Sequence, residues 1–235
     1  MAPPRALLFD VFGTVVDWRG GLIGQLAAFG EARGIEADWP ALADAWRGAY
    51  LPSMERVRRG EEPWTNLETL QRRSLEQLVA DQAIAGLSAQ DLDEINRFWR
   101  ALPPWPDSAP GLTRLKQRFT IATLSNGDVA LLVAMAKAGA LPWDMVFAAE
   151  LFEHYKPDPE TYLGACRLLD LPPEQVMMCA AHAGDLEAAR ALGLQTAFIS
   201  RPLESGPGPA REPASHAQWD ISAVGLEDLA DQLGA

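Results

Sequence analysis

The sequence is poor in cysteine, in basic residues and in long apolar runs. Two cysteines, Cys166 and Cys179, are too few for a disulfide framework. The chain has 20 Lys and Arg residues and 32 Asp and Glu residues. The resulting net charge of -12 argues against a nucleic-acid partner or an anionic membrane surface. No run approaches the roughly 18 apolar residues of a membrane span. Asp10 also interrupts the apolar run nearest the N-terminus. We therefore expect a cytoplasmic protein with no targeting segment.

Short apolar runs that end in polar residues are the main pattern in the rest of the chain. They lack the alternation of a half-exposed strand, which is typical of strands buried on both faces of a parallel sheet. Helical patterns separate the later runs, and this alternation predicts an α/β fold with a doubly wound, mainly parallel sheet. The five predicted strands are 5–10, 119–126, 145–150, 175–182 and 195–200.

Residues 17–95 break this alternation, because they contain successive helical patterns and no convincing strand. We predict a helical insert there, forming a cap over an α/β core made of residues 1–16 and 96–235. Four prolines in 102–111 mark the return to the core. The Pro- and Gly-rich stretch 200–218 predicts an extended surface loop.

Polar side chains gather where the predicted strands end. Asp10 ends the first, Ser125 and Asn126 end the second, and His182 and Asp185 follow the fourth. Ligands of an open α/β sheet bind beyond the carboxyl ends of its strands, so we expect these side chains to share one crevice beneath the helical insert.

Four motifs carry a resemblance that covers nearly the whole chain. The segments "FDVFGT", "LSNG", "KPDPETY" and "HAGD" occur in the order and approximate spacing of the haloacid dehalogenase superfamily. "FDVFGTVVD" together with "AWRGAY" resembles its L-2-haloacid dehalogenase branch. The resemblance implies a superfamily-type core with an inserted cap, and hydrolysis of short L-2-haloacids to 2-hydroxy acids. It implies water as the second reactant, no metal or other cofactor, and a possible homodimer.

The resemblance also implies a role for each matching residue. Asp10 would be the nucleophile that forms a covalent ester, oriented by Thr14 and held ionised by Lys156. Arg47 and Asn126 would stabilise the halide, Ser125 would hold the substrate carboxylate, and Asp185 would pair with Lys156 and help to activate water. The pocket lining would include Val11, Phe12, Tyr50 and Tyr162.

Phe12 separates displacement at carbon from phosphate chemistry. Superfamily phosphatases resemble one another in carrying a second aspartate at this position and in binding Mg²⁺. Phe12 can neither donate a proton nor hold water near a metal, and Asp185 is a lone acid where a metal would want more oxygen ligands. A halide leaves as a stable anion and needs no general acid, so Phe12 fits dehalogenation.

The segment "AAHAGD" departs from the Ser-Ser-Asn-aromatic-Asp pattern of the branch. His182 stands at the asparagine position, and we expect it to accept a proton from water, alone or with Asp185. Gly184 stands at the aromatic position and changes the halide cradle, which leaves the halogen preference open, fluoride included.

Three other functions stay open at this point. The nearest is another displacement at carbon, such as ring opening of a strained cyclic amino acid. The others are a binding module that has lost turnover and an Mg²⁺-dependent phosphatase.

Overall fold

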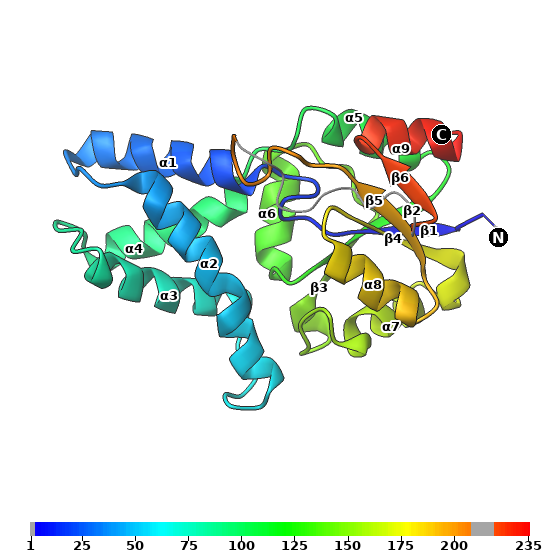
Figure 1. The fold of residues 1–235 in the computed structure, drawn as a ribbon, viewed down its shortest axis with the longest axis horizontal. Coiled ribbons are helices and arrows are strands. Elements are labelled where there is room, and N and C mark those ends of the chain that lie inside the picture. The colour runs from blue at the N-terminus through cyan, green and yellow to red at the C-terminus, as the bar shows by residue number, and fades with distance from the viewer. Residues whose placement is uncertain (1–2, 208–218) are drawn as a thin grey trace.

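A computed structural model describes residues 3–207 and 219–235, and in this part of the chain six strands form one sheet (Figure 1). All strand pairs are parallel, and their order is β3-β2-β1-β4-β5-β6. The predicted α/β class with a doubly wound parallel sheet is confirmed. The strands are β1 (Ala6–Phe9), β2 (Thr120–Ser125), β3 (Met145–Ala148), β4 (Val176–Ala180), β5 (Gln195–Ile199) and β6 (Ile221–Ala223).

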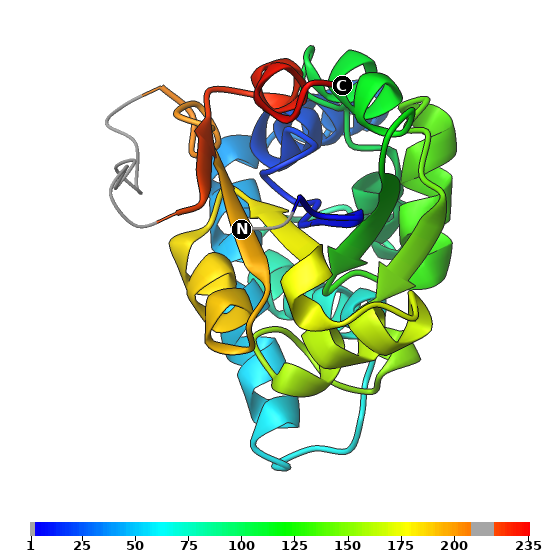
Figure 2. The same cartoon turned by 90° about the vertical axis from the view of Figure 1, so that its right-hand side faces the viewer.

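Helices cover both faces of the sheet, as the side chains of β1 illustrate. Leu7 and Phe9 belong to an apolar cluster that includes residues of α5, α6 and α9, whereas Leu8 belongs to a second cluster with α7 and α8. Figure 2 shows α9, in red, and α8, in orange, on opposite sides of the sheet. Burial on both faces explains why the strands are continuous apolar runs. These helices are α5 (Ser108–Leu115), α6 (Val129–Ala138), α7 (Pro159–Leu168), α8 (Ala183–Ala191) and α9 (Leu226–Leu233).

The five predicted strands are all present, but each is shorter than its predicted run. The polar residues included at the run ends, such as Asp10 and His182, lie beyond the last strand residue. The edge strand β6 and the helix α9 were not predicted. Three residues are too few to show a strand pattern, and α9 follows them directly.

Between β1 and β2 the chain forms the helical insert, which lies beside the sheet region in Figure 1. A side chain caps the start of each of its helices, and these caps are Asp17, Asp38, Asn66 and Ser88. Within residues 3–207 and 219–235 every helix is too short or too polar to traverse a lipid bilayer. The helices are α1 (Trp18–Arg33), α2 (Trp39–Arg58), α3 (Leu67–Asp81) and α4 (Ala89–Asn96), and the short 3₁₀ helix η1 (Arg97–Ala101) follows them.

The two connections between the insert and the sheet region run side by side. Val16 and Pro104 form an antiparallel bridge. The Asp17 N–H donates to the Pro103 carbonyl at 2.9 Å, and the Trp105 N–H donates to the Val15 carbonyl at 3.0 Å. The chain therefore enters and leaves the insert at one place, close to the end of β1.

Contacts between side chain and backbone also join the insert to the region around β2 and α7. Asp128, which precedes α6, accepts hydrogen bonds from the backbone N–H groups of Leu67 and Glu68 at 3.2 and 2.9 Å. Its carboxylate thus satisfies the start of α3 from across the interface. Tyr155 donates its hydroxyl proton to the Thr65 carbonyl at 2.7 Å.

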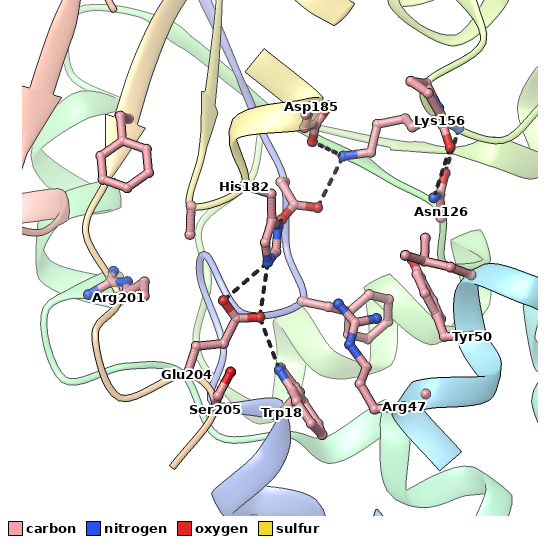
Figure 3. Close-up of a pocket in the computed structure, with 18 of the residues that line it drawn as sticks. Trp18, Arg47, Tyr50, Asn126, Lys156, His182, Asp185, Arg201, Glu204 and Ser205 are labelled. Atoms are coloured by element: carbon pink, nitrogen blue, oxygen red, sulfur yellow. Dashed lines mark hydrogen bonds and ion pairs between the residues drawn. The ribbon is translucent and has the colours of Figure 1, made fainter. Parts of the chain in front are cut away.

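The predicted surface loop 200–218 is partly described, because residues 208–218 lie outside the described ranges. Residues 201–207 form turns next to the end of β5. Two of their side chains, Arg201 and Glu204, point toward the same pocket as the residues that follow β1 and β4 (Figure 3).

Candidate active site

A pocket of about 700 Å³ opens between the helical insert and the carboxyl ends of the strands (Figure 3). The site residues that the sequence predicted fall into two groups. Three of them, Val11, Thr14 and Ser125, are buried and are not among the described residues that line the pocket. The others line it: Asp10, Phe12, Arg47, Tyr50, Asn126, Lys156, Tyr162, His182 and Asp185.

Asp10 lies directly after β1, and both of its carboxylate oxygens are hydrogen-bonded. Lys156 Nζ is 3.0 Å from Oδ1. Thr14 Oγ1 donates to Oδ2 at 2.8 Å, and His182 Nδ1 is 3.0 Å from that same oxygen. Burial would raise the pKa of Asp10, but the Lys156 charge and the His182 hydrogen bond outweigh it and lower the pKa below its usual range. Asp10 is therefore ionised before any substrate binds.

Lys156 lies between two carboxylates, because its ammonium group contacts both Asp10 and Asp185. The side chain is 7% exposed, and its pKa is raised because the two carboxylates outweigh the cost of burial. Asn126 fixes the backbone here, since its Oδ1 accepts from the Lys156 N–H at 2.7 Å. The loop after β2 therefore positions the cation that contacts the aspartate after β1.

Asp185 lies in the first turn of α8 and accepts two hydrogen bonds. One comes from Lys156 and the other from the Tyr162 hydroxyl, whose oxygen is 2.5 Å from Asp185 Oδ1. Burial raises the pKa of Asp185 despite the nearby Lys156 charge, and Asp10 raises it further. Asp185 is thus a stronger base than an exposed carboxylate would be.

His182 lies between two carboxylates. Its Nδ1 is 3.0 Å from Asp10 Oδ2, and its Nε2 is 3.0 Å from Glu204 Oε1. Burial lowers the pKa of His182, but the hydrogen bonds to Asp10 and Glu204 outweigh this and raise it to about 10. With both ring nitrogens facing acceptors, His182 is poorly placed to take a proton from water, which argues against its predicted role as the base.

The opposite wall of the pocket comes from the helical insert. Arg47 of α2 points into the pocket, and its Nη1 is buried without a hydrogen-bond partner among the described residues. The guanidinium carbon lies 4.2 Å from the ring centre of Tyr50. Phe12 packs edge-on against Tyr50 with ring centres 6.4 Å apart. An unpaired buried guanidinium nitrogen beside aromatic rings is well suited to an anion.

Ser125 ends β2 and Asn126 follows it, but other groups already use parts of their side chains. Ser125 Oγ accepts a hydrogen bond from the Gly127 N–H at 3.1 Å. Asn126 lines the pocket while binding the Lys156 backbone. Of the two, Asn126 is the better placed to touch a ligand.

Sequence reasoning missed several pocket residues, among them Trp18, Arg201 and Glu204. Arg201 donates to both oxygens of Asp107, at 2.8 and 3.0 Å, so its charge is already paired. The rule that strand ends converge could have found Arg201 and Glu204, since both follow β5. The proline-rich composition around them favoured a surface loop instead.

The residues of this site do not fit a magnesium ion. The Lys156 ammonium already bridges Asp10 and Asp185, and Phe12 supplies no oxygen. Among residues 3–207 and 219–235, no group of three or more His, Cys, Asp or Glu side chains is arranged to hold a metal. Mg²⁺ prefers several oxygen ligands in near-octahedral geometry.

Comparisons with known proteins agree with this architecture. The family model of haloacid dehalogenase-like hydrolases matches residues 4–193. The chain is 30% identical to (S)-2-haloacid dehalogenase 4A of Burkholderia cepacia, over 84% of this chain and 83% of that protein. A solved L-2-haloacid dehalogenase is 52% identical with a TM-score of 0.95, over 98% of this chain and 99% of that one. A solved defluorinating L-2-haloacid dehalogenase is 45% identical with a TM-score of 0.94, over 99% and 96%.

The chain therefore belongs to the haloacid dehalogenase-like hydrolases, and within that family it groups with the L-2-haloacid dehalogenases. The predicted family resemblance is confirmed.

Proposed function

We propose that this protein hydrolyses short L-2-haloacids to 2-hydroxy acids through a covalent ester on Asp10, without a metal or other cofactor. One observation carries the proposal. An ionised Asp10 faces the same pocket as Arg47, whose buried Nη1 has no hydrogen-bond partner among the described residues. The first group can act as a nucleophile, and the second can receive a departing anion.

The first step is a displacement at C2 of the substrate. Asp10 Oδ1 attacks C2, an oxygen–carbon bond forms, and the carbon–halogen bond breaks in line with it. The halide leaves with the bonding electron pair and is stabilised by Arg47, while Asn126 offers a further polar contact. This step inverts C2. The predicted contact between Ser125 and the substrate carboxylate stays a prediction.

The second step is hydrolysis of the ester. Water attacks Cγ of Asp10 and gives a proton to Asp185, which the Tyr162 hydroxyl and Lys156 hold in place. The bond between Cγ and Oδ1 then breaks, and Oδ1 leaves with the product and takes up the proton from Asp185. Asp10 regains a second oxygen from water, and the remaining water proton is released to solvent, so that the carboxylate is ionised for the next turnover.

We also propose that the helical insert acts as a cap domain over an α/β core of residues 1–16 and 96–235. Arg47 and Tyr50 of α2 supply one wall of the pocket, and residues that follow the strands supply the other. Closure of the insert over the pocket would exclude bulk water during the first step.

The other functions are less well supported. The site does not fit Mg²⁺, which argues against a phosphatase. Asp10, Lys156 and Asp185 form one connected group, and a binding module would not need it. Ring opening of a cyclic amino acid differs in needing a proton for its leaving nitrogen, so a cyclic substrate belongs in the assay.

The test is halide release from L- and D-2-chloropropionate and from fluoroacetate, with EDTA present. We expect halide from the L-acid only among the chloropropionates, and none from Asp10→Asn. The matched control is Asp81→Asn, at the exposed end of α3, which should keep wild-type activity. No halide from any substrate, or turnover by Asp10→Asn, would overturn the proposal. Fluoride release would show that the site also accepts the hardest leaving group.

Homodimer formation and a cytoplasmic location are further proposals. Two buried free cysteines are consistent with a reducing compartment. Sedimentation analysis at several protein concentrations would test the dimer.

A further inference from the structure

The contacts of His182 require a proton on both of its ring nitrogens. A neutral imidazole has one donor nitrogen and one acceptor nitrogen. Here each nitrogen faces an oxygen that can only accept, because Asp10 lies at Nδ1 and Glu204 at Nε2, both at 3.0 Å. Both bonds form only if the ring is an imidazolium that donates in both directions.

Glu204 is held against His182 by more than this one bond. The Trp18 indole N–H donates to Glu204 Oε1 at 3.1 Å, and the side chain is 17% exposed. Gly13 leaves space for it, because a Cβ at that position would lie 2.1 Å from Glu204 Oε1. The Gly13 φ of 88° also suits only glycine well, so the turn after Asp10 and the approach of Glu204 depend on the same residue.

We propose that Glu204 is a positioning residue that keeps His182 doubly protonated while Asp10 carries the ester. His182 Nδ1–H and Thr14 Oγ1–H, both directed at Asp10 Oδ2, then form the oxyanion hole of the hydrolytic step. This inference rests on the proposed ester mechanism.

The change in charge on Asp10 during the reaction explains why a second carboxylate is needed. In the free enzyme, Asp10 and Glu204 both stabilise the His182 cation. Once Oδ1 has bonded to the substrate, Asp10 is a neutral ester and only the Glu204 charge remains beside His182. When water adds to Cγ, the carbonyl π electrons move to Oδ2, and this oxyanion accepts hydrogen bonds from His182 and Thr14. The proton from water goes to Asp185, so His182 keeps both of its protons throughout.

The charged groups around His182 define the expected pH dependence. Asp10 and Glu204 contact it directly, Lys156 and Asp185 lie one contact further away, and Arg47 faces the same pocket from α2. Of the two carboxylates that raise the pKa of His182, only Glu204 persists in the ester form. Glu204→Gln should therefore shift the basic limb of the pH profile of kcat to lower pH. It should also slow hydrolysis of the ester.

The kinetic test compares Glu204→Gln with the control Glu187→Gln, an exposed glutamate of α8. We expect Glu204→Gln to release a burst of halide at nearly the wild-type rate and then to turn over roughly tenfold more slowly, with the ester visible by mass spectrometry. In a His182→Gln background, the same change should have no further effect on kcat, because Glu204 acts through His182. Equal slowing of both steps, or an additive effect in the double variant, would overturn the inference.

A second measurement needs neither turnover nor a variant of Glu204. The chain has three histidines, and the ¹⁵N signals of His182 are those that His182→Gln lacks. We expect both ring nitrogens of wild-type His182 to stay protonated at pH 8. A His182 that titrates near its ordinary value in the wild type would overturn the inference even if halide release supports the proposed function. If halide release fails while His182 is doubly protonated, the proposed function is wrong and the charge assignment stands.

Discussion

The two walls of the pocket differ in how far their charges are paired before a ligand arrives. On the strand side, both oxygens of Asp10 are hydrogen-bonded, by Lys156 on one and by Thr14 and His182 on the other. On the insert side, Arg47 has a buried nitrogen with no partner among the described residues. The nucleophile is positioned in advance, whereas the group for the leaving anion is completed only by its ligand.

This difference fits a reaction in which the attacking group must be ordered throughout and the anion is present only after the bond breaks. Donors that are aligned in advance cost no reorganisation at the moment of reaction. An unpaired guanidinium favours the state in which a negative charge has developed beside it. Substitutions on the two walls should therefore have different kinetic signatures.

The largest effect should come from Lys156→Gln on the strand side. We expect a loss of kcat/KM on the order of 10³-fold, with a new acid limb in the pH profile. The Lys156 charge lowers the pKa of Asp10, so its removal raises that pKa and leaves less ionised nucleophile as the pH falls. Halide release between pH 4 and 8 measures this, beside Lys137→Gln, an exposed lysine of α6, as the control. An unchanged pH profile would contradict the electrostatic role.

Arg47→Ala should have the next largest effect, without an acid limb. Loss of the cation for the departing halide should lower the rate of the first step roughly 10²-fold and leave hydrolysis of any ester formed unchanged. Single-turnover halide release separates the two steps. The control is Arg56→Ala on the same helix, whose side chain is 65% exposed. If Arg47→Ala slowed only ester hydrolysis, the proposed division of roles between the walls would be wrong.

Tyr162→Phe should have a smaller effect, confined to the second step. The lost hydrogen bond to Asp185 should slow ester hydrolysis roughly tenfold, the usual scale for a bond to a charged group. Mass spectrometry during turnover should then show more of the chain as ester. Tyr155→Phe is the matched control, because that hydroxyl contacts the Thr65 carbonyl instead. Equal accumulation of ester in both variants would rule out a specific role for Tyr162.

The smallest expected effect concerns Asp128, which joins the two walls through the start of α3. Burial raises the pKa of Asp128 from 3.8 to about 6. Between these values the folded chain binds more protons than the unfolded chain, so this group's contribution to the free energy of unfolding grows as the pH falls from about 6 to 4. Urea unfolding at pH 7 and pH 4.5 should show Asp128→Asn losing stability relative to the wild type at the lower pH, by about 1–2 kcal/mol. A constant difference would contradict the shifted pKa.

The sequence predicted the parts of this molecule that depend on local pattern. Continuous apolar runs were enough to predict strands buried on both faces of a sheet, and they also placed Asp10 at the end of the first strand. The rule that strand ends converge was enough to bring Asp185 to the same crevice as Asp10, and the family resemblance added Lys156.

The sequence did not predict which side chains from distant segments pair with each other. The chemical state of His182 depends on Glu204, 22 residues further on in a stretch whose composition predicts a loop. A histidine at a strand end is a candidate base as long as only one of its hydrogen-bond partners is known. The partners of both ring nitrogens decide whether either nitrogen can accept a proton. Similarly, no local signal indicates that Asp128 caps a helix of the insert.

The insert is joined to the rest of the chain at a single place, where Val16 and Pro104 form a bridge. The two walls of the pocket can therefore change independently of each other during evolution. Because the insert begins and ends at one place, it can be lengthened, shortened or replaced without changing the order of the strands or the position of Asp10. A lineage can thus keep one nucleophile and exchange the surface that selects its leaving group. In this chain, α2 and Arg47 lie within the insert, and Asp10, Lys156 and Asp185 lie outside it.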